Sequence, residues 1–516
     1  SSVQSFERYQ RKSAWSWEHQ ALTRARFCAG DAAIGARFES IRETVLREPR
    51  DAVKLCTDVI AMRNKMADAH PNQSALFDLK HDRGGMIDIE FIVQYLVLRH
   101  AAMHPQLTAD IGNIALLGLC GSLGLIDTEL AQRTANAYRL FRRLQHEIRL
   151  QGADPLPTGD EDRESIARMM GCRDAAELMA RLDVRRLVAS RFDTIFGEPE
   201  SPTTVDGDAV PPADVADHDS AESMAPVLAA LGFPDAATDA ARIAMTWQSP
   251  RLRMLPDTSR TRLVRLINGA LAIISALPDG RSATLNRLLD FLEAIGRRAA
   301  YLALLTEYPP TLTRVIRMMH ASGWAATYLT RHPLLLDELI DERALDAPPD
   351  WAAFAAECSR QLEAARGDAE RQMDILREMH HAQQFRLLSQ DLDGRLSVER
   401  LADHLSMLAD ILVDATIRAA WETVPNRHRD IPAFAVIAYG KLGGKELGYA
   451  SDLDVVFLFD DDDQDAPPLY AKLAQRFITW MTSHTSAGIL FDIDIALRPD
   501  GASGLMGSSV QSFERY

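Results

Sequence analysis

Apolar residues along most of the chain recur every three or four positions, which is the spacing of an amphipathic helix. In the first part of the chain this pattern predicts a helix over 11–29, a helix from 86 to about 100, and further helices over 111–125, 127–151 and 160–196. Between residues 224 and 430 it predicts helices over 260–277, 284–307, 311–320, 324–331, 369–391 and 397–424. The chain should therefore be mainly helical.

The pattern changes close to the C-terminal end. A short apolar run over 434–439 and a second ending at Phe459 are typical of buried strands, and glycines separate them. Residues 467–486 return to helical spacing, and residues 488–499 alternate as a third strand. We therefore expect a mainly α protein, in which helical bundles accompany a small α/β core with a mixed sheet near the C-terminus.

Composition divides this helical chain further. Its 516 residues are enough for two to four domains. A stretch rich in Pro, Asp, Ser and Ala interrupts the helices, as a disordered linker does. The expected parts are a helical domain over 1–197, the linker over 198–223, a central helical region over 224–430, the α/β core over 431–507 and a terminal segment over 508–516.

Charge and cysteine usage exclude some classes of function. The net charge of −16 argues against a nucleic-acid partner, because phosphate backbones require basic surfaces. No apolar run is long enough to span a bilayer, and we expect neither a secretory signal nor a membrane partner. The five cysteines are scattered without metal-binding spacing, so we expect reduced thiols in a cytoplasmic protein.

The candidate catalytic residues are aspartates on the expected strands of the core. Asp452 and Asp454 are two residues apart on an extended segment, so both carboxylates should face the same side. Asp492 and Asp494 are spaced in the same way on the third strand. Clustered carboxylates repel unless a cation lies between them, and Mg²⁺ prefers oxygen ligands. Asp452, Asp454 and Asp494 are therefore predicted to bind two Mg²⁺ ions that clamp a phosphoryl group.

Two other polar groups have structural explanations. The acidic residues 460–463 and 465 follow the second strand and are expected to form a solvated turn. The adjacent His380 and His381 point about 100° apart on a helix, so we expect them to be structural rather than metal ligands.

The motifs of the core resemble a known family. Gly-Lys-Leu-Gly-Gly-Lys-Glu-Leu-Gly-Tyr-Ala-Ser-Asp-Leu-Asp over 440–454 and Leu-Arg-Pro-Asp-Gly-Ala-Ser-Gly-Leu over 497–505 are similar to the adenylylating unit of the glutamine synthetase adenylyltransferase/adenylyl-removing enzymes. That family has the nucleotidyltransferase fold of polymerase-β-like enzymes. The similarity extends over nearly the whole chain outside the linker. One departure is Ala496, where the family pattern usually has an arginine.

The resemblance implies an activity and a set of ligands. It implies transfer of AMP from ATP to a tyrosine hydroxyl of glutamine synthetase, with release of pyrophosphate, by residues Asp452, Asp454 and Asp494. The residues expected to contact ATP are Gly440, Lys441, Gly443, Gly444, Lys445, Ser451 and Arg498. Glutamine synthetase is the implied protein substrate, and a PII-type signalling protein is a second possible partner.

Three alternatives stay open at this point. The first alternative is phosphorolytic removal of AMP from adenylylated glutamine synthetase, for which the same carboxylates would serve. The second is a non-catalytic helical scaffold that binds glutamine synthetase or a PII-type regulator. A small-molecule nucleotidyltransferase is disfavoured by the large helical region. The sequence leaves open the roles of Arg24, Arg26, Lys80, Asp88 and Glu90.

The order of the segments raises a separate question. Residues 1–9 recur as 508–516, so the unit resembles one half of the family's tandem pair with its segments in permuted order. Either residues 1–197 dock onto the core and complete it, or the core lacks properly placed helices.

Overall fold

The computed structural model describes residues 2–72, 74, 76–109, 112–153, 156–196, 224–249, 252, 257–296, 298–339, 345 and 347–495. The protein is mainly α, as expected, with one small mixed sheet. The expected linker, the repeated segment over 508–516, Ala496 and Arg498 lie outside the described residues. No helix in the described ranges is both long enough and apolar enough to cross a bilayer.

The N-terminal part of the chain, up to Phe196, forms helices and one strand. Its helices are α1 (Val3–Lys12), α2 (Ser16–Leu22), α3 (Ala32–Leu46), α4 (Ala52–Ala69), α5 (Met86–His100), η1 (Pro105–Thr108), α6 (Asn113–Ser122), α7 (Thr128–Leu150), α8 (Asp160–Met169), α9 (Ala175–Leu182) and α10 (Val184–Phe196). Short acidic side chains begin several of them, as at α7, where Asp127 accepts a hydrogen bond from the Leu130 N–H.

The expectation of one helix over 11–29 is wrong. The chain leaves α1 after Lys12, and α2 ends at Leu22. The next residues form strand β1 (Arg26–Gly30), which pairs with a strand near the other end of the chain. Pairing with this distant strand decides the local conformation, because such a short run carries little intrinsic preference of its own.

The central region follows the predicted helices closely. Its helices are α11 (Ala225–Ala230), α12 (Ala236–Gln248), α14 (Asp257–Ser275), α15 (Arg281–Ile295), α16 (Ala299–Glu307), α17 (Pro309–Ala321), α18 (Gly323–Arg331), η2 (Pro333–Leu339), α20 (Trp351–Ala364), α21 (Ala369–Leu392) and α22 (Val398–Glu422). The single helix expected over 284–307 is two helices, because α15 ends at Ile295 and α16 begins at Ala299.

The sheet has the strand order β1-β2-β3-β4. β2 (Phe434–Ala438) pairs antiparallel with β1 and with β3 (Leu453–Phe459), and β3 pairs parallel with β4 (Ile493–Asp494). The one-turn helix α23 (Gly440–Gly443) joins β2 to the loop before β3, and α24 (Ala466–Thr482) forms the crossover between β3 and β4. The predicted strand over 434–439 and the predicted crossover helix are confirmed.

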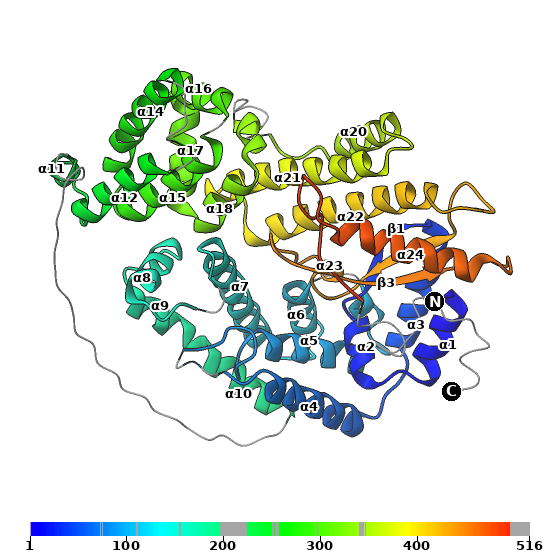
Figure 1. Cartoon of the computed structure of the whole chain (residues 1–516). Coiled ribbons are helices and arrows are strands. Elements are labelled where there is room, and N and C mark those ends of the chain that lie inside the picture. The colour runs from blue at the N-terminus through cyan, green and yellow to red at the C-terminus, as the bar shows by residue number, and fades with distance from the viewer. Residues whose placement is uncertain are drawn as a thin grey trace.

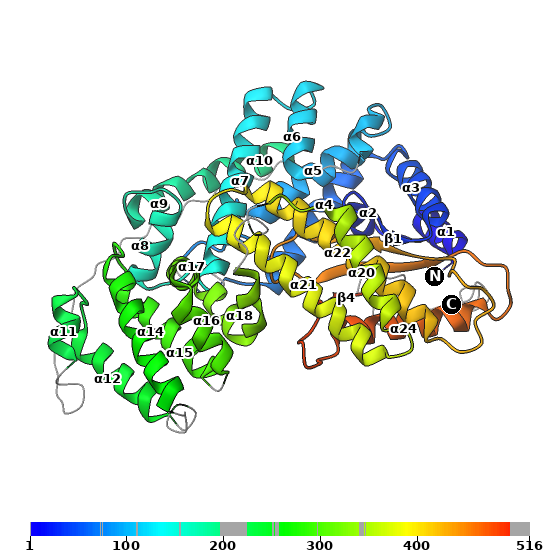
Figure 2. The ribbon, with the colours of Figure 1, turned by 90° about the horizontal axis from the view of Figure 1, so that it is seen from above.

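The apolar residues form two cores. One core joins side chains of the N-terminal part to the sheet, to α22 and to α24, and includes Phe38, Tyr138, Trp421 and Phe477. The second core lies in the bundle of α11 to α18 and also receives Leu150 and Phe385. In Figures 1 and 2, the long helices α21 and α22 run between this bundle and the sheet. The N-terminal part is therefore docked on the sheet.

Candidate functional site

Three carboxylates converge at the end of the two parallel strands. Asp454 of β3 and Asp494 of β4 are register partners, and Asp452 immediately precedes β3. Each residue has an oxygen within 4.8 Å of an oxygen of the other two. Burial, together with the charges of Asp452 and Asp494, raises the pKa of Asp454 to about 6. The three residues that the sequence singled out are therefore brought together, and oxygen donors in this number suit a hard divalent cation.

Asp492 lies outside this group. β4 contains only Ile493 and Asp494, and the Asp492 carbonyl accepts a hydrogen bond of 2.9 Å from the Leu453 N–H. The strand is shorter than the one expected over 488–499, although Phe491, Ile493 and Ile495 pack against the core while Asp492 and Asp494 are exposed. A fourth carboxylate, Asp492, is thus not part of the convergent group.

Gly440 brings the backbone against the carboxylate of Asp454. Its φ is +54°, in the left-handed region, and a Cβ at this position would lie 2.0 Å from Asp454 Oδ2. Only glycine fits both conditions without displacement of the carboxylate. The first glycine of the motif is thus explained by its contact with a candidate metal ligand.

Gly443 and Gly444 have a different structural reason. A Cβ on Gly443 would lie 1.9 Å from the Arg24 carbonyl oxygen, and a Cβ on Gly444 would lie 2.9 Å from the Arg24 guanidinium. Both glycines are buried. Close packing against the N-terminal segment therefore accounts for them, and contact of either glycine with ATP stays a prediction.

The two lysines of the motif have different surroundings. Burial and the positive charges of Arg149, Lys80 and Arg142 lower the pKa of Lys441 to about 8. Lys441 is also among the charges that act on Asp454. Lys445 is exposed and acts instead on Asp410. Lys441 is therefore the lysine whose charge acts on the carboxylate cluster, and contact of either lysine with ATP stays a prediction.

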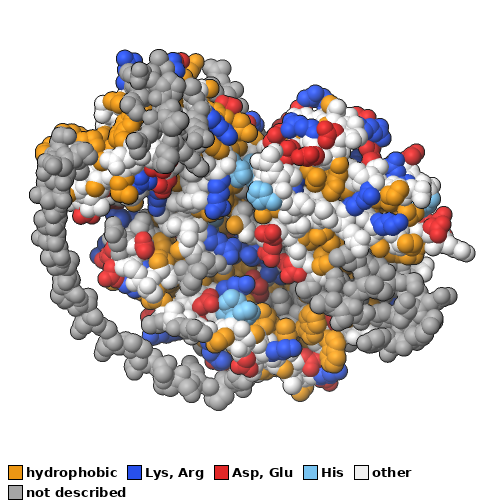
Figure 3. All heavy atoms as spheres, in the orientation of Figure 1, with side chains coloured by type: hydrophobic (Ala, Val, Ile, Leu, Met, Phe, Trp, Pro, Cys, Tyr) orange, Lys and Arg blue, Asp and Glu red, His pale blue; other side chains and the backbone are white. Residues whose placement is uncertain are grey.

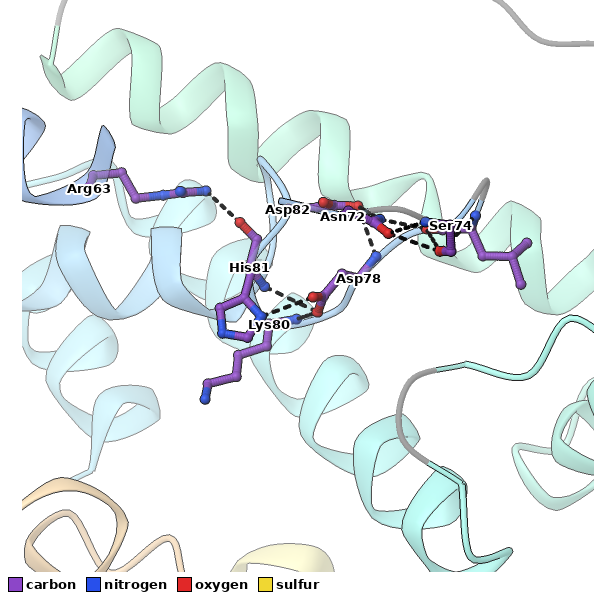
Figure 4. Close-up of polar contacts among 8 residues, drawn as sticks. Arg63, Asn72, Ser74, Asp78, Lys80, His81 and Asp82 are labelled. Atoms are coloured by element: carbon purple, nitrogen blue, oxygen red, sulfur yellow. Dashed lines mark hydrogen bonds and ion pairs between the residues drawn. The ribbon is translucent and has the colours of Figure 1, made fainter. Parts of the chain in front are cut away.

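A hydrogen-bonded loop presents Lys80 to this region. The Asp78 carboxylate accepts a bond from the backbone N–H of Lys80 (2.8 Å) and contacts the His81 ring (2.9 Å), while Arg63 donates to the His81 carbonyl (2.9 Å). The Lys80 side chain extends away from this network (Figure 4). Lys and Arg side chains gather near the centre of the face in Figure 3, beside acidic ones. The loop thus holds one member of a basic group around Lys441.

The residues whose roles the sequence left open include structural ion pairs. Arg24 pairs with Glu90 (3.1 Å) and with Glu446 (2.5 Å), which lies in the loop after α23. Arg26 pairs with Asp410 of α22 at 2.9 Å. These pairs tie the N-terminal segment to the core.

Asp88 and Asp461 also form specific polar contacts. Asp88 is buried, pairs with Arg63 and accepts a bond of 2.6 Å from the Gly84 N–H. The expectation of a fully solvated acidic turn over 460–465 is wrong for Asp461. Its carboxylate is buried and accepts a hydrogen bond of 2.7 Å from the Tyr470 hydroxyl.

Sequence reasoning missed the basic side chains of α7. Arg142, His146 and Arg149 are four and three residues apart, which places them on one helix face, and they line a cavity together with Ser451. This i, i+4, i+7 spacing is the signal that points to them. Ser451 is buried, and its hydroxyl oxygen accepts a hydrogen bond of 3.1 Å from the Gly448 N–H.

Comparisons with known proteins agree with the motif resemblance. The sequence model of the glutamate-ammonia ligase adenylyltransferase family matches residues 1–41 and 312–516. The sequence model of the GlnD PII-uridylyltransferase family matches residues 60–196. Three similar proteins are each named bifunctional glutamine synthetase adenylyltransferase/adenylyl-removing enzyme.

The similarity to these three proteins extends over most of the chain. The protein from Ralstonia nicotianae is 46% identical over 85% of the chain and 46% of its own length. The one from Aromatoleum aromaticum is 43% identical over 97% of the chain and 53% of its own length. The one from Chromobacterium violaceum is 40% identical over 100% of the chain and 57% of its own length. The chain thus spans about half the length of the curated relatives it matches.

Proposed function

Because the chain belongs to the family of bifunctional glutamine synthetase adenylyltransferase/adenylyl-removing enzymes, we propose that its carboxylate site transfers AMP from ATP to a tyrosine hydroxyl of glutamine synthetase. The observation that carries the proposal is the convergence of Asp452, Asp454 and Asp494 close to Lys441. Glutamine synthetase is the proposed protein substrate. The match of residues 60–196 to a PII-uridylyltransferase model supports a PII-type protein as a second partner.

The donor set fits magnesium. Three oxygen ligands converge, and the raised pKa of Asp454 reflects burial and repulsion that a cation would relieve. We propose that Asp452, Asp454 and Asp494 hold two Mg²⁺ ions. Bound ions of this kind would neutralise the negative charge that develops on the phosphoryl group during its transfer.

The side chains around the carboxylates have distinct proposed roles. Lys441 binds the triphosphate, and the absence of a side chain on Gly440 leaves room for the Asp454 carboxylate. A carboxylate oxygen of Asp494 accepts the proton of the tyrosine hydroxyl as its oxygen attacks the α-phosphorus. The bond from the α-phosphorus to the bridging oxygen breaks, and pyrophosphate leaves. Positioning and charge stabilisation provide most of the acceleration in such a transfer.

Removal of AMP by phosphate is the second candidate, because the relatives are named for both activities. The same carboxylates would serve: a phosphate oxygen attacks the phosphorus of the AMP attached to tyrosine, the bond from phosphorus to the tyrosine oxygen breaks, that oxygen takes up a proton, and ADP is released. The nucleotide product therefore separates the two reactions.

Labelled ATP incubated with Mg²⁺, glutamine synthetase and the protein tests the proposal. We expect label on glutamine synthetase and release of pyrophosphate, and we expect Asp454→Asn to slow the transfer about a thousandfold, which corresponds to roughly 4 kcal/mol of barrier. Asp460→Asn is the matched control, because Asp460 is exposed and pairs with Arg37 beyond the other end of β3. Transfer that persists in Asp454→Asn, or no transfer by either protein, contradicts the proposal. ADP formed from phosphate and adenylylated glutamine synthetase indicates the removal reaction.

A further inference from the structure

A cavity of about 400 Å³ lies next to the carboxylates, where four distant parts of the chain meet. Helix α7 supplies Arg142 and Arg149, α18 supplies Trp324, α22 supplies Val398, and the loop before β3 supplies Tyr449 and Ser451. Its volume falls within the range of sites that enclose small organic ligands.

Part of the cavity lining is basic and adjoins the carboxylate cluster. Ser451 directly precedes Asp452, so the wall continues into the carboxylate cluster. Arg142 and Arg149 line the cavity and also belong to the cations that lower the pKa of Lys441. A chain with a net charge of −16 thus gathers several cations at one point, and a polyanion would relieve their mutual repulsion.

Other residues of the lining are apolar and aromatic. Trp324 is stacked with Tyr449, with ring centroids 5.2 Å apart and an interplanar angle of 22°. Val398 and Leu401 at the start of α22, together with Leu150, continue this wall. An apolar compartment next to a cluster of cations suits a ligand with a flat, weakly polar ring at one end and several phosphates at the other.

Hydrogen bonds hold these walls in place. The Asp391 carboxylate at the end of α21 bonds with His146 Nε2 at 2.8 Å and accepts a bond from the Tyr449 hydroxyl at 3.0 Å. Arg142 Nη2 donates to the Glu446 carbonyl at 2.7 Å. The cavity is therefore a built feature of the docked arrangement and depends on α7, α21 and the core loop together.

We propose that this composite cavity holds the adenosine of ATP between α7, Trp324 and Val398, with Arg142 and Arg149 binding the triphosphate that reaches the carboxylates. This inference rests on the proposed nucleotidyl transfer. It assigns to α7, within the segment similar to PII-uridylyltransferase, a direct contact with the nucleotide. It also makes nucleotide affinity depend on the central bundle through Trp324.

The experiment compares binding of ATP and of inorganic tripolyphosphate, each with Mg²⁺, by isothermal titration calorimetry. Val398→Trp places a large ring in the apolar part of the lining, and we expect it to weaken ATP binding at least tenfold while tripolyphosphate binding changes less than twofold. Arg149→Gln should weaken both ligands at least fivefold. The matched controls are Val264→Trp and Arg317→Gln, which change exposed residues on α14 and α17 and should alter neither affinity.

Either of two results overturns the assignment of adenosine to this cavity. One is that Val398→Trp leaves ATP binding unchanged, and the other is that the wild-type protein binds ATP no more tightly than tripolyphosphate. If either occurs while AMP transfer still depends on Asp454, the proposed function stands and only the pocket assignment fails. If the expected binding pattern appears without AMP transfer to glutamine synthetase, the pocket assignment stands and the proposed function fails.

Discussion

Gly440 and Asp454 are in such close contact that a single added carbon on Gly440 would lie 2.0 Å from the Asp454 carboxylate oxygen. The Tyr439 N–H, one residue earlier, donates a hydrogen bond of 2.9 Å to the Asp454 carbonyl. The turn after β2 is thus held to the first residues of β3 by backbone pairing, and the absence of a side chain at residue 440 leaves the carboxylate in place.

Gly440→Ala should therefore damage the site more than it damages the fold. The left-handed backbone at Gly440 costs alanine about 1–2 kcal/mol, and displacement of Asp454 adds an overpacking cost of roughly 1–3 kcal/mol. We expect AMP transfer to fall at least tenfold. Urea unfolding and labelled-ATP transfer measure the two effects.

Gly394→Ala is the matched control for this change. Gly394 also has a positive φ, of +71°, but a Cβ there meets nothing within 4 Å. Gly394→Ala should lose only the stability that a left-handed backbone costs alanine, and it should keep full transfer activity. Equal activity in the two variants would show that the Gly440 contact does not position Asp454.

The buried ion pairs of Arg24 link three parts of the protein. Arg24 bonds Glu90 of α5 and Glu446 of the core loop, and the Tyr138 hydroxyl of α7 donates to both carboxylates, at 2.9 and 2.8 Å. Arg24→Met leaves the buried Glu446 and the half-buried Glu90 without this cation, which costs about 3–5 kcal/mol. We expect a matching loss of stability in urea unfolding.

Arg139→Met provides the comparison for Arg24→Met. Arg139 pairs with Glu399 at 3.2 Å, with both side chains more than 40% exposed, so the loss should stay below about 1 kcal/mol. If the two variants lose similar stability, the Arg24 network does not hold the N-terminal segment on the core.

Local patterns were sufficient for much of the core. The apolar run at β2, the helical spacing of α24 and the two-residue spacing of Asp452 and Asp454 are visible in the sequence and agree with the structure. Asp494 was also correctly grouped with them. These features depend on residues that are close together in the chain, so periodicity describes them well.

Long-range relationships could not be predicted in the same way. β1 forms because Arg26 pairs across the sheet with Ala438, which no local pattern records. The cavity joins Arg149 to Trp324 and Ser451, and residues so far apart in the chain share no periodic signal. The third strand expected over 488–499 is longer than the two residues, Ile493 and Asp494, that pair with β3.

His380 should make the stability of the protein sensitive to acid. Its ring lies in the core against Phe491, with centroids 4.5 Å apart, and its neighbours include His332, His381 and Arg377. Burial first, and then the charges of His332 and Arg377, lower the pKa of His380 to about 3. An unfolded histidine has a pKa of about 6.5. Between these values the unfolded chain binds a proton that the folded chain does not, so stability falls as the pH falls below about 6.5.

His380→Phe removes this proton uptake. We expect the variant to gain roughly 1.4 kcal/mol relative to wild type for each pH unit between about 6.5 and 4, and to differ little in pH dependence above about 7. Urea unfolding at a series of pH values measures the slope. His484→Phe is the control, because it makes the same substitution at a histidine that is exposed to water. If the free energies of unfolding of wild type and His380→Phe change with pH in parallel, His380 takes up its proton while the protein stays folded.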